Sequence, residues 1–242
     1  LGAGVLSAND AVSKYMVESY PIGQILCLRQ VAALVAILAY VWWSGRWRDL
    51  RVNDKAGQAW RGVTHVGGAA LIVWSLSLLP IATVTAIAFS SPIVVLIFSM
   101  RLLGERVSWR RKIAVLIGFA GVVVIIRPGG VSFEWALLVP VAAAIVAGLR
   151  DLLTRRVARV DTSLSVLVWA SVLLIVVSLF TIPLGWKPVT LGASIWFIAN
   201  GLLNAGAHFL MIEALRLGDA ALISPFRYTA ILWATFTGFI VW

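Results

Sequence analysis

The sequence predicts an all-α membrane protein, a bundle of many transmembrane helices. Of its 242 residues, 61% are hydrophobic and 12% are charged, and the mean hydropathy is +0.98. A soluble domain is about half apolar and about a quarter charged. The apolar residues gather in runs of about 20, the length that an α-helix needs to cross a bilayer core. The alternating pattern of a membrane β-barrel is absent from these runs.

Nine apolar runs follow one another along the chain, separated by short polar joints. We expect spans at 1–17, 22–43, 62–79, 81–100, 109–126, 133–150, 163–185, 191–215 and 220–242. The first run begins at Leu1 without a methionine, so we expect a trimmed chain. We expect no removable signal peptide, because the run has neither a basic leader nor a small-residue cleavage site.

The fourth run is interrupted by Ser90, Ser91 and Pro92. These residues predict a break in its helix. Two interpretations of the break stay open: the freed backbone groups face a cavity, or they form a harmless kink.

Positive charges alternate between the joints. Lys and Arg concentrate in every second joint, at 46–61, 101–112, 150–159 and 216. The other joints hold only Arg127 and Lys187. By the positive-inside rule, the basic joints and the N-terminus face the cytoplasm. The net charge of +10 therefore indicates topology. Nucleic-acid binding is not expected, because the basic residues are dispersed among the spans.

An internal repeat relates the two halves of the chain. The segment "SLSLLPIATVTAIAFSSPIVVLIFSMRLLGERV" at 75–107 is echoed by "ALRLGDAALISPFRYTAILWATFTGFIVW" at 214–242. We infer five spans in each repeat, 1–130 and 131–242, with the tenth span absent from this chain. An odd number of spans inverts the second copy. Inverted repeats are a recurring plan of secondary transporters, whose binding site lies between the repeats near the midplane.

Three segments carry a family resemblance. They are "DAVSKYMVESYPIGQILCLRQ" at 10–30, "SLSLLP…SSP…LLGERVSWRRKIAVLIGFAGVVVIIRPGG" at 75–130 and "SPFRYTAILWA" at 224–234. In this order and spacing they resemble the drug/metabolite transporter superfamily, EamA type. The resemblance implies a ten-helix inverted-repeat carrier in a bacterial inner membrane. It also implies cargo such as amino acids, vitamins including riboflavin, or nucleoside-like metabolites, without specifying which.

Polar residues inside the spans are the first candidates for substrate binding. Asn200, Asn204 and His208 recur at four-residue spacing, so they share one face of span eight. In the repeat alignment, His65 on span three falls opposite Asn204. Either these residues line a central cavity or they form hydrogen bonds between helices. Two histidines without cysteine or carboxylate partners do not predict a metal site.

Further substrate-binding candidates are a cation and several aromatic residues. Arg227 lies roughly 10 Å into span nine and forms either an ion pair or a contact with an anionic part of the substrate. The aromatic candidates outside the interfacial belts are Trp74, Trp169, Tyr228 and Trp233. Aromatic walls suit planar or cationic solutes, and packing against lipid is the alternative for each.

Charged residues in span one predict an ion pair with span two. Asp10 and Arg29 lie at a similar depth, roughly 11 Å inside the outer ends of their helices. We expect Asp10 to pair with Arg29 and Lys14 to add a second contact, since an unpaired charge is costly there. The pair either locks the first two helices or lets Asp10 exchange a proton during transport.

Together these features predict a secondary transporter of a small polar, ring-bearing metabolite, working by alternating access in the lipid bilayer. No nucleophile with a base, metal cluster or paired catalytic carboxylates is evident, so neither enzyme activity nor a cofactor is expected. The alternatives are a structural or regulatory membrane subunit and, less favoured, a membrane-embedded enzyme. Ala114, Gly118 and Gly121 form a small-residue face on span five that favours close helix packing or homodimerisation.

Overall fold

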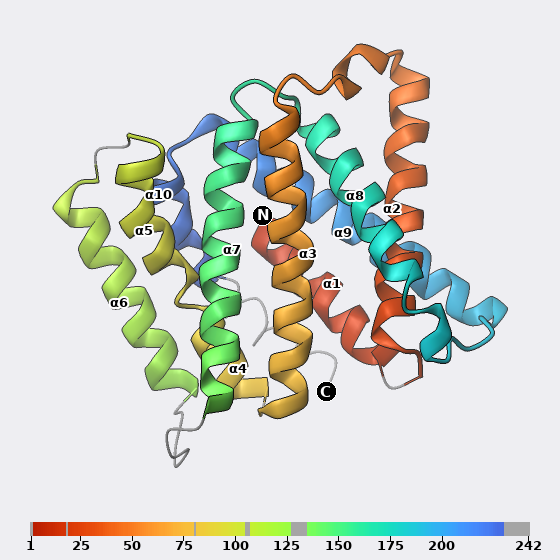
Figure 1. Cartoon of the computed structure of the whole chain (residues 1–242), viewed down its shortest axis with the longest axis horizontal. Helices are drawn as coiled ribbons and strands as arrows, with labels where there is room; N and C mark the ends of the chain where they lie inside the picture. The colour runs from red at the N-terminus through yellow and green to blue at the C-terminus, as the bar shows by residue number, and fades with distance from the viewer. Residues whose placement is uncertain (1, 18, 80, 105–106, 127–134, 230–242) are drawn as a thin grey trace. The chain divides into compact units, whose positions relative to one another are not determined.

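A computed structural model describes residues 2–17, 19–79, 81–104, 107–126 and 135–229 (Figure 1). Helices joined by short loops make up these ranges, and no strand occurs within them. The predicted all-α class is therefore confirmed. The described chain forms two compact units, each assembled from separate parts of the sequence.

The first unit comprises Leu1–Gln58, Ala158–Glu213 and Thr229–Trp242. Its helices are α1 (Gly2–Val17), α2 (Ile22–Ser44), η1 (Trp47–Leu50), α8 (Ser163–Leu179), η3 (Ile182–Leu184) and most of α9 (Leu191–Leu217). Helices α2 and α8 pack along each other. Met16, Ile25 and Phe197 form a buried apolar cluster that joins α1, α2 and α9.

The second unit comprises Ala59–Val157 and Ala214–Tyr228. Its helices are most of α3 (Lys55–Leu78), then α4 (Ile81–Ala88), α5 (Ser91–Leu102), α6 (Trp109–Ile126), η2 (Trp135–Leu137), α7 (Leu138–Val157), α10 (Ala220–Ile223) and η4 (Ser224–Tyr228). Helix α5 packs against α7. Val95, Leu152, Leu215 and Ala220 form the apolar centre of this contact.

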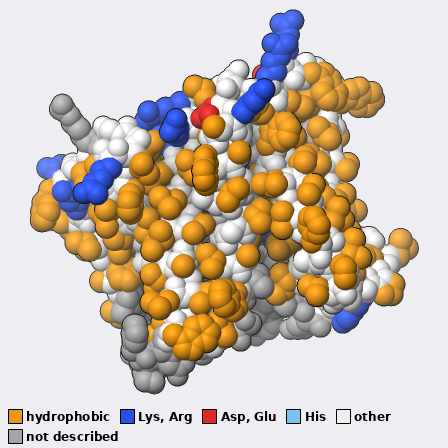
Figure 2. Space-filling view, viewed as in Figure 1, with side chains coloured by type: hydrophobic (Ala, Val, Ile, Leu, Met, Phe, Trp, Pro, Cys, Tyr) orange, Lys and Arg blue, Asp and Glu red, His pale blue; other side chains and the backbone are white. Residues whose placement is uncertain are grey.

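The observed helices follow most of the predicted spans. Helix α6 begins at Trp109 and ends at Ile126, as expected, whereas α3 begins at Lys55, upstream of the expected 62. Among the described residues, three helical stretches are long and apolar enough to cross a membrane: Ile22–Ser44, Trp135–Val157 and Leu191–Leu217. Helices α5 and α8 are shorter apolar helices. Hydrophobic side chains are widespread on the visible surface (Figure 2), as lipid contact requires.

The predicted break in the fourth span is confirmed. Helix α4 ends at Ala88 and α5 begins at Ser91. The Ser90 backbone N–H and hydroxyl both donate to the Ile87 carbonyl, at 2.9 and 2.6 Å. These bonds satisfy the Ile87 carbonyl within the break, and the two interpretations of the break stay predictions.

The prediction of one continuous helix from residue 220 is wrong at its start. Helix α10 has only four residues, and Ser224–Tyr228 forms a 3₁₀ turn. Pro225 lacks a backbone N–H donor and its ring clashes with the preceding turn, so an α-helix cannot run through it unperturbed. The depth assigned to Arg227 assumed that continuous helix and no longer holds. Residues 230–242, with Trp233, lie outside the described part of the chain.

Candidate functional site

The first unit contains a group of buried polar side chains with one half-buried serine, here called the buried amide network. Its members come from four helices and are Asn9, Ser13, Gln30, Ser171, Asn200 and Asn204. None carries a formal charge. In a segment without water, such groups are stable only when they hydrogen-bond one another.

One half of the network joins α1 to α9. The Asn9 amide donates from Nδ2 to the main-chain oxygen of Asn200 at 2.9 Å, and also to the Asn200 side-chain oxygen. Asn200 in turn donates from Nδ2 to the Ser13 hydroxyl at 2.9 Å. Asn9 is 1% exposed and Asn200 is 0% exposed. The contact is therefore sealed from solvent and lipid within this unit.

The other half joins α9 to α2 and α8. Asn204 donates from Nδ2 to the Gln30 side-chain oxygen at 2.8 Å. Gln30 then donates from Nε2 to the Ser171 hydroxyl at 3.1 Å. Since Asn200 and Asn204 lie one turn apart on α9, a single helix face supplies both halves.

Gly201 lets α9 approach α2 at the centre of the network. A Cβ atom added there would lie 2.5 Å from the Arg29 carbonyl oxygen and 2.6 Å from the Ala32 Cβ. These are backbone and near-backbone atoms, which cannot move aside without shifting the helix. The absence of a side chain at this position thus sets the short distance at which the Asn204 and Gln30 amides meet.

One acceptor of the network is not used within the described residues. The Asn9 oxygen Oδ1 is buried and accepts no hydrogen bond there. A buried acceptor without a donor costs about 1–3 kcal/mol.

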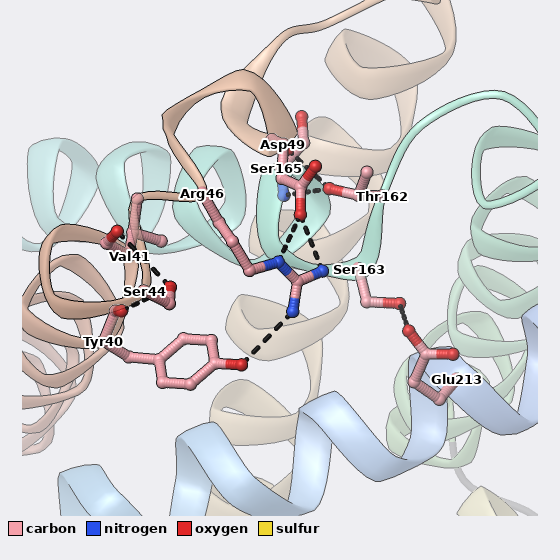
Figure 3. Close-up of polar contacts among 9 residues, drawn as sticks. All are labelled: Tyr40, Val41, Ser44, Arg46, Asp49, Thr162, Ser163, Ser165 and Glu213. Carbon is pink, nitrogen blue, oxygen red and sulfur yellow. Dashed lines mark hydrogen bonds and ion pairs between the residues drawn. The ribbon is translucent and has the colours of Figure 1, made fainter.

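Polar contacts at one end of the first unit order the turn after α2 and join α8 to α9 (Figure 3). Arg46 pairs with Asp49 at 2.6 Å and donates from Nη1 to the Tyr40 hydroxyl at 3.2 Å. The hydrogen bonds that Arg46 donates to Tyr40 and Asp49 raise the pKa of its guanidinium. Ser163 at the start of α8 donates to Glu213 on α9 at 2.6 Å.

Comparison with known proteins identifies the family. The model of the EamA-like transporter family matches residues 1–127, more than half of the chain. This chain belongs to the EamA-like transporter family. The resemblance inferred from the sequence motifs is thereby confirmed, as is the assignment to membrane transport.

Relatives of this EamA-like transporter include carriers of named metabolites. An S-adenosylmethionine uptake transporter of Rickettsia bellii is 26% identical over 93% of this chain and 77% of its own length. A riboflavin transporter of Rhizobium johnstonii is 33% identical over 69% of this chain and 57% of its own length. A riboflavin transporter of Vibrio cholerae is 26% identical over 91% of this chain and 75% of its own length.

A solved crystal structure has the same fold as this EamA-like transporter. It superposes with a TM-score of 0.82 and 22% sequence identity, covering 99% of this chain and 85% of that chain. At this identity the match shows the fold alone.

The substrate-binding candidates of this EamA-like transporter are divided between the units. Asn200 and Asn204 lie in the buried amide network, and His208 lies one turn further along α9 with a partly buried side chain. His65 and Trp74 lie on α3 in the second unit. Their predicted position in a shared cavity with Asn204 stays a prediction. The hydrogen bonds that the Asn200 and Asn204 side-chain amides form join α9 to other helices, as the second interpretation of these residues predicts.

The aromatic candidates differ in their surroundings. Trp74 and Trp169 are 52% and 51% exposed within the described structure. Tyr228 packs inside the second unit, with its ring centroid 6.1 Å from that of Phe89. A Cβ added at Gly118 would collide with the Tyr228 ring. Gly118 therefore serves close packing within the unit, as one interpretation of the small-residue face on α6 expected.

Several predicted residues lie outside what the structure describes. These are the side chains of Asp10, Lys14 and Arg227, and the whole of Trp233. The Asp10–Arg29 pair consequently stays a prediction.

Sequence inspection assigned no site role to four members of the network, Asn9, Ser13, Gln30 and Ser171. A signal for two of them is present, because Asn9 and Ser13 repeat the four-residue spacing of Asn200 and Asn204.

Proposed function

We propose that this EamA-like transporter is a secondary carrier of a small metabolite that bears a fused nitrogen heterocycle. The buried amide network is the observation that carries the proposal. It joins α1, α2, α8 and α9 through uncharged donors and acceptors of the kind that complement heterocycle edges. Carboxamides pair with ring nitrogens and exocyclic amino groups through two hydrogen bonds, as they do with adenine in nucleic acids.

The relatives support the same class of cargo. S-adenosylmethionine and riboflavin, the solutes named for them, both combine a fused nitrogen heterocycle with a hydroxylated five-carbon group. Either heterocycle offers an N–H donor to an acceptor such as the Asn9 Oδ1. Asn9 is 1% exposed in the described conformation, so that contact requires α1 and α9 to separate during alternating access.

The remaining features of the carrier are part of the proposal. The two repeats, 1–130 and 131–242, open the substrate site alternately to the inside and to the outside of the cell. The N-terminus lies in the cytoplasm of a bacterial cell. Solute binding involves the α9 face of Asn200, Asn204 and His208. The other proposed contacts are His65, Trp74, Trp169, Arg227, Tyr228 and Trp233.

Counterflow in proteoliposomes tests this function. Vesicles containing the purified full chain are loaded with unlabelled solute, and the entry of labelled S-adenosylmethionine or riboflavin is measured. We expect one of the two to accumulate transiently and to be competed by its own analogues but not by amino acids without a ring. Folded protein that exchanges neither solute, nor any heterocycle of a nucleoside and flavin panel, would contradict the proposal.

A further inference from the structure

The second unit contains a group of charged and polar side chains between α3 and α7, here called the Arg61 cluster. It consists of Arg61 on α3 and of Arg150, Asp151 and Thr154 on α7. Arg61 is 4% exposed, Asp151 6% and Thr154 3%. Sequence inspection gave Arg61 only a part in topology, because it falls at the edge of a basic joint.

Hydrogen bonds order the cluster. Arg61 donates from Nε to the Thr154 hydroxyl at 2.9 Å, and that hydroxyl donates to the Arg150 carbonyl at 2.7 Å. Arg150 contacts Asp151 Oδ1 through Nη2 at 3.1 Å and through Nε at 3.3 Å. Thr154 thereby fixes the orientation of the Arg61 guanidinium, and the Arg150 guanidinium points toward Asp151.

The charges within the cluster do not balance. It contains two guanidinium groups and one carboxylate. Burial and the charge of Arg150 both oppose the charge of Arg61, while Asp151 favours it. A buried cation is normally retained only with an anion in contact.

Arg61 also has hydrogen-bond donors to spare. A guanidinium carries five N–H donors, and within the described residues the bond from Nε to Thr154 is the one that Arg61 forms. Its two terminal nitrogens form the planar fork that binds two oxygens of a carboxylate or phosphate together. A lysine would supply the charge but not the fork.

We propose that the Arg61 cluster is a binding site for an oxyanion, the carboxylate or phosphate of a transported solute or of a lipid headgroup. Arg61 lies in the second turn of α3, at the end that the charge distribution predicts to be cytoplasmic. Anionic headgroups and solutes leaving or entering the carrier both reach that level. Where the oxyanion belongs to a solute, the inference rests on the proposed transport function. It then favours a carboxylate-bearing solute such as S-adenosylmethionine over uncharged riboflavin.

Thermal unfolding of the purified full chain, in neutral detergent, tests the site with inorganic phosphate as probe. The midpoint is compared in sodium phosphate and in sodium chloride at equal ionic strength. We expect phosphate to raise the midpoint by about 2–4 °C. Phosphate also stabilises proteins generally, so dependence on Arg61 decides the result.

Two Arg61 variants and a control supply that dependence, with Arg150→Gln in reserve. The phosphate effect should vanish in Arg61→Gln and fall by at least half in Arg61→Lys. It should persist in the control Arg46→Gln, which removes a paired arginine from the first unit. If Arg61→Gln does not fold, Arg61→Lys and Arg150→Gln carry the test. Equal phosphate effects in all folded variants would overturn the proposal.

Nanodiscs distinguish the two sources of the oxyanion. Stabilisation by phosphatidylglycerol over phosphatidylcholine that falls by at least half in Arg61→Lys would assign the site to a headgroup. An Arg61-dependent phosphate effect without a lipid effect would assign it to a solute. Absence of both Arg61-dependent effects would refute the site even if counterflow succeeds. Failed counterflow with an intact phosphate effect would refute only the proposed transport function.

Discussion

Asn9 on α1 and Asn200 on α9, 191 positions apart in the chain, are joined by an amide hydrogen bond of 2.9 Å. Both side chains are almost completely buried. The pair connects α1 to α9, and Ser13 extends the same contact by one turn. The stability of this unit consequently depends on uncharged polar groups as well as on apolar packing.

Asn9→Ala and Asn200→Ala should each lower the unfolding free energy by about 0.5–2 kcal/mol, the range found for hydrogen bonds between membrane helices. The double variant should lose less than the sum, because each single change already breaks the bond between the two side chains. The bond to the Asn200 main-chain oxygen persists in Asn200→Ala and is lost in Asn9→Ala. Denaturant unfolding in mixed micelles measures these values. Ser194→Ala on the exposed start of α9 serves as control, and an equal loss there would show that the assay does not report the network.

Gly201→Ala should destabilise the first unit by about 1–3 kcal/mol, since the added methyl group overlaps the α2 backbone. Gly206 on the same helix has no atom within 4 Å of an added Cβ. Gly206→Ala should therefore be neutral or slightly stabilising, because alanine is the better helix former. The two melting temperatures provide the comparison. Loss of stability at Gly206 equal to that at Gly201 would contradict the close approach of α9 to α2.

Asn204→Ala and His208→Ala should separate packing from substrate contact. Asn204 is 4% exposed and bonded to Gln30, so Asn204→Ala should lower the melting temperature together with the solute affinity. His208→Ala should weaken solute affinity in counterflow more than it lowers the melting temperature or the expression level. If His208→Ala lowers solute affinity and melting temperature in proportion, His208 is a packing residue.

Asp10→Asn tests the predicted ion pair in vesicles with an imposed pH gradient. Loss of gradient-driven accumulation with exchange intact would support proton coupling through Asp10. Loss of folded protein would support a lock between α1 and α2. If Asp10→Asn changes neither gradient-driven accumulation nor the amount of folded protein, both roles of the predicted pair are excluded.

The sequence predicted those features that depend on local chemistry. The ends of α6 and the break before Ser91 follow from the apolar run at 109–126 and from the Ser-Ser-Pro triplet. The 3₁₀ turn at Ser224–Tyr228 was overlooked because hydropathy outweighed the backbone effect of Pro225. The partners of Asn200 and Asn204 could not be predicted, since spacing along α9 identifies a polar face but not the helix that meets it.

The long sequence separation within the buried amide network has a consequence for biosynthesis. Asn204 and Gln30 are 174 positions apart. At synthesis rates of about 5–20 residues per second, the ribosome needs roughly 10–40 s to supply the partners of α1 and α2 after those helices emerge. Through that interval the Asn9 and Gln30 amides must find temporary partners in water, in the insertion machinery or in a nascent neighbour. A nascent chain that stalls before α9 therefore leaves α1 and α2 in the bilayer with exposed polar faces, a feature by which membrane quality control can recognise it.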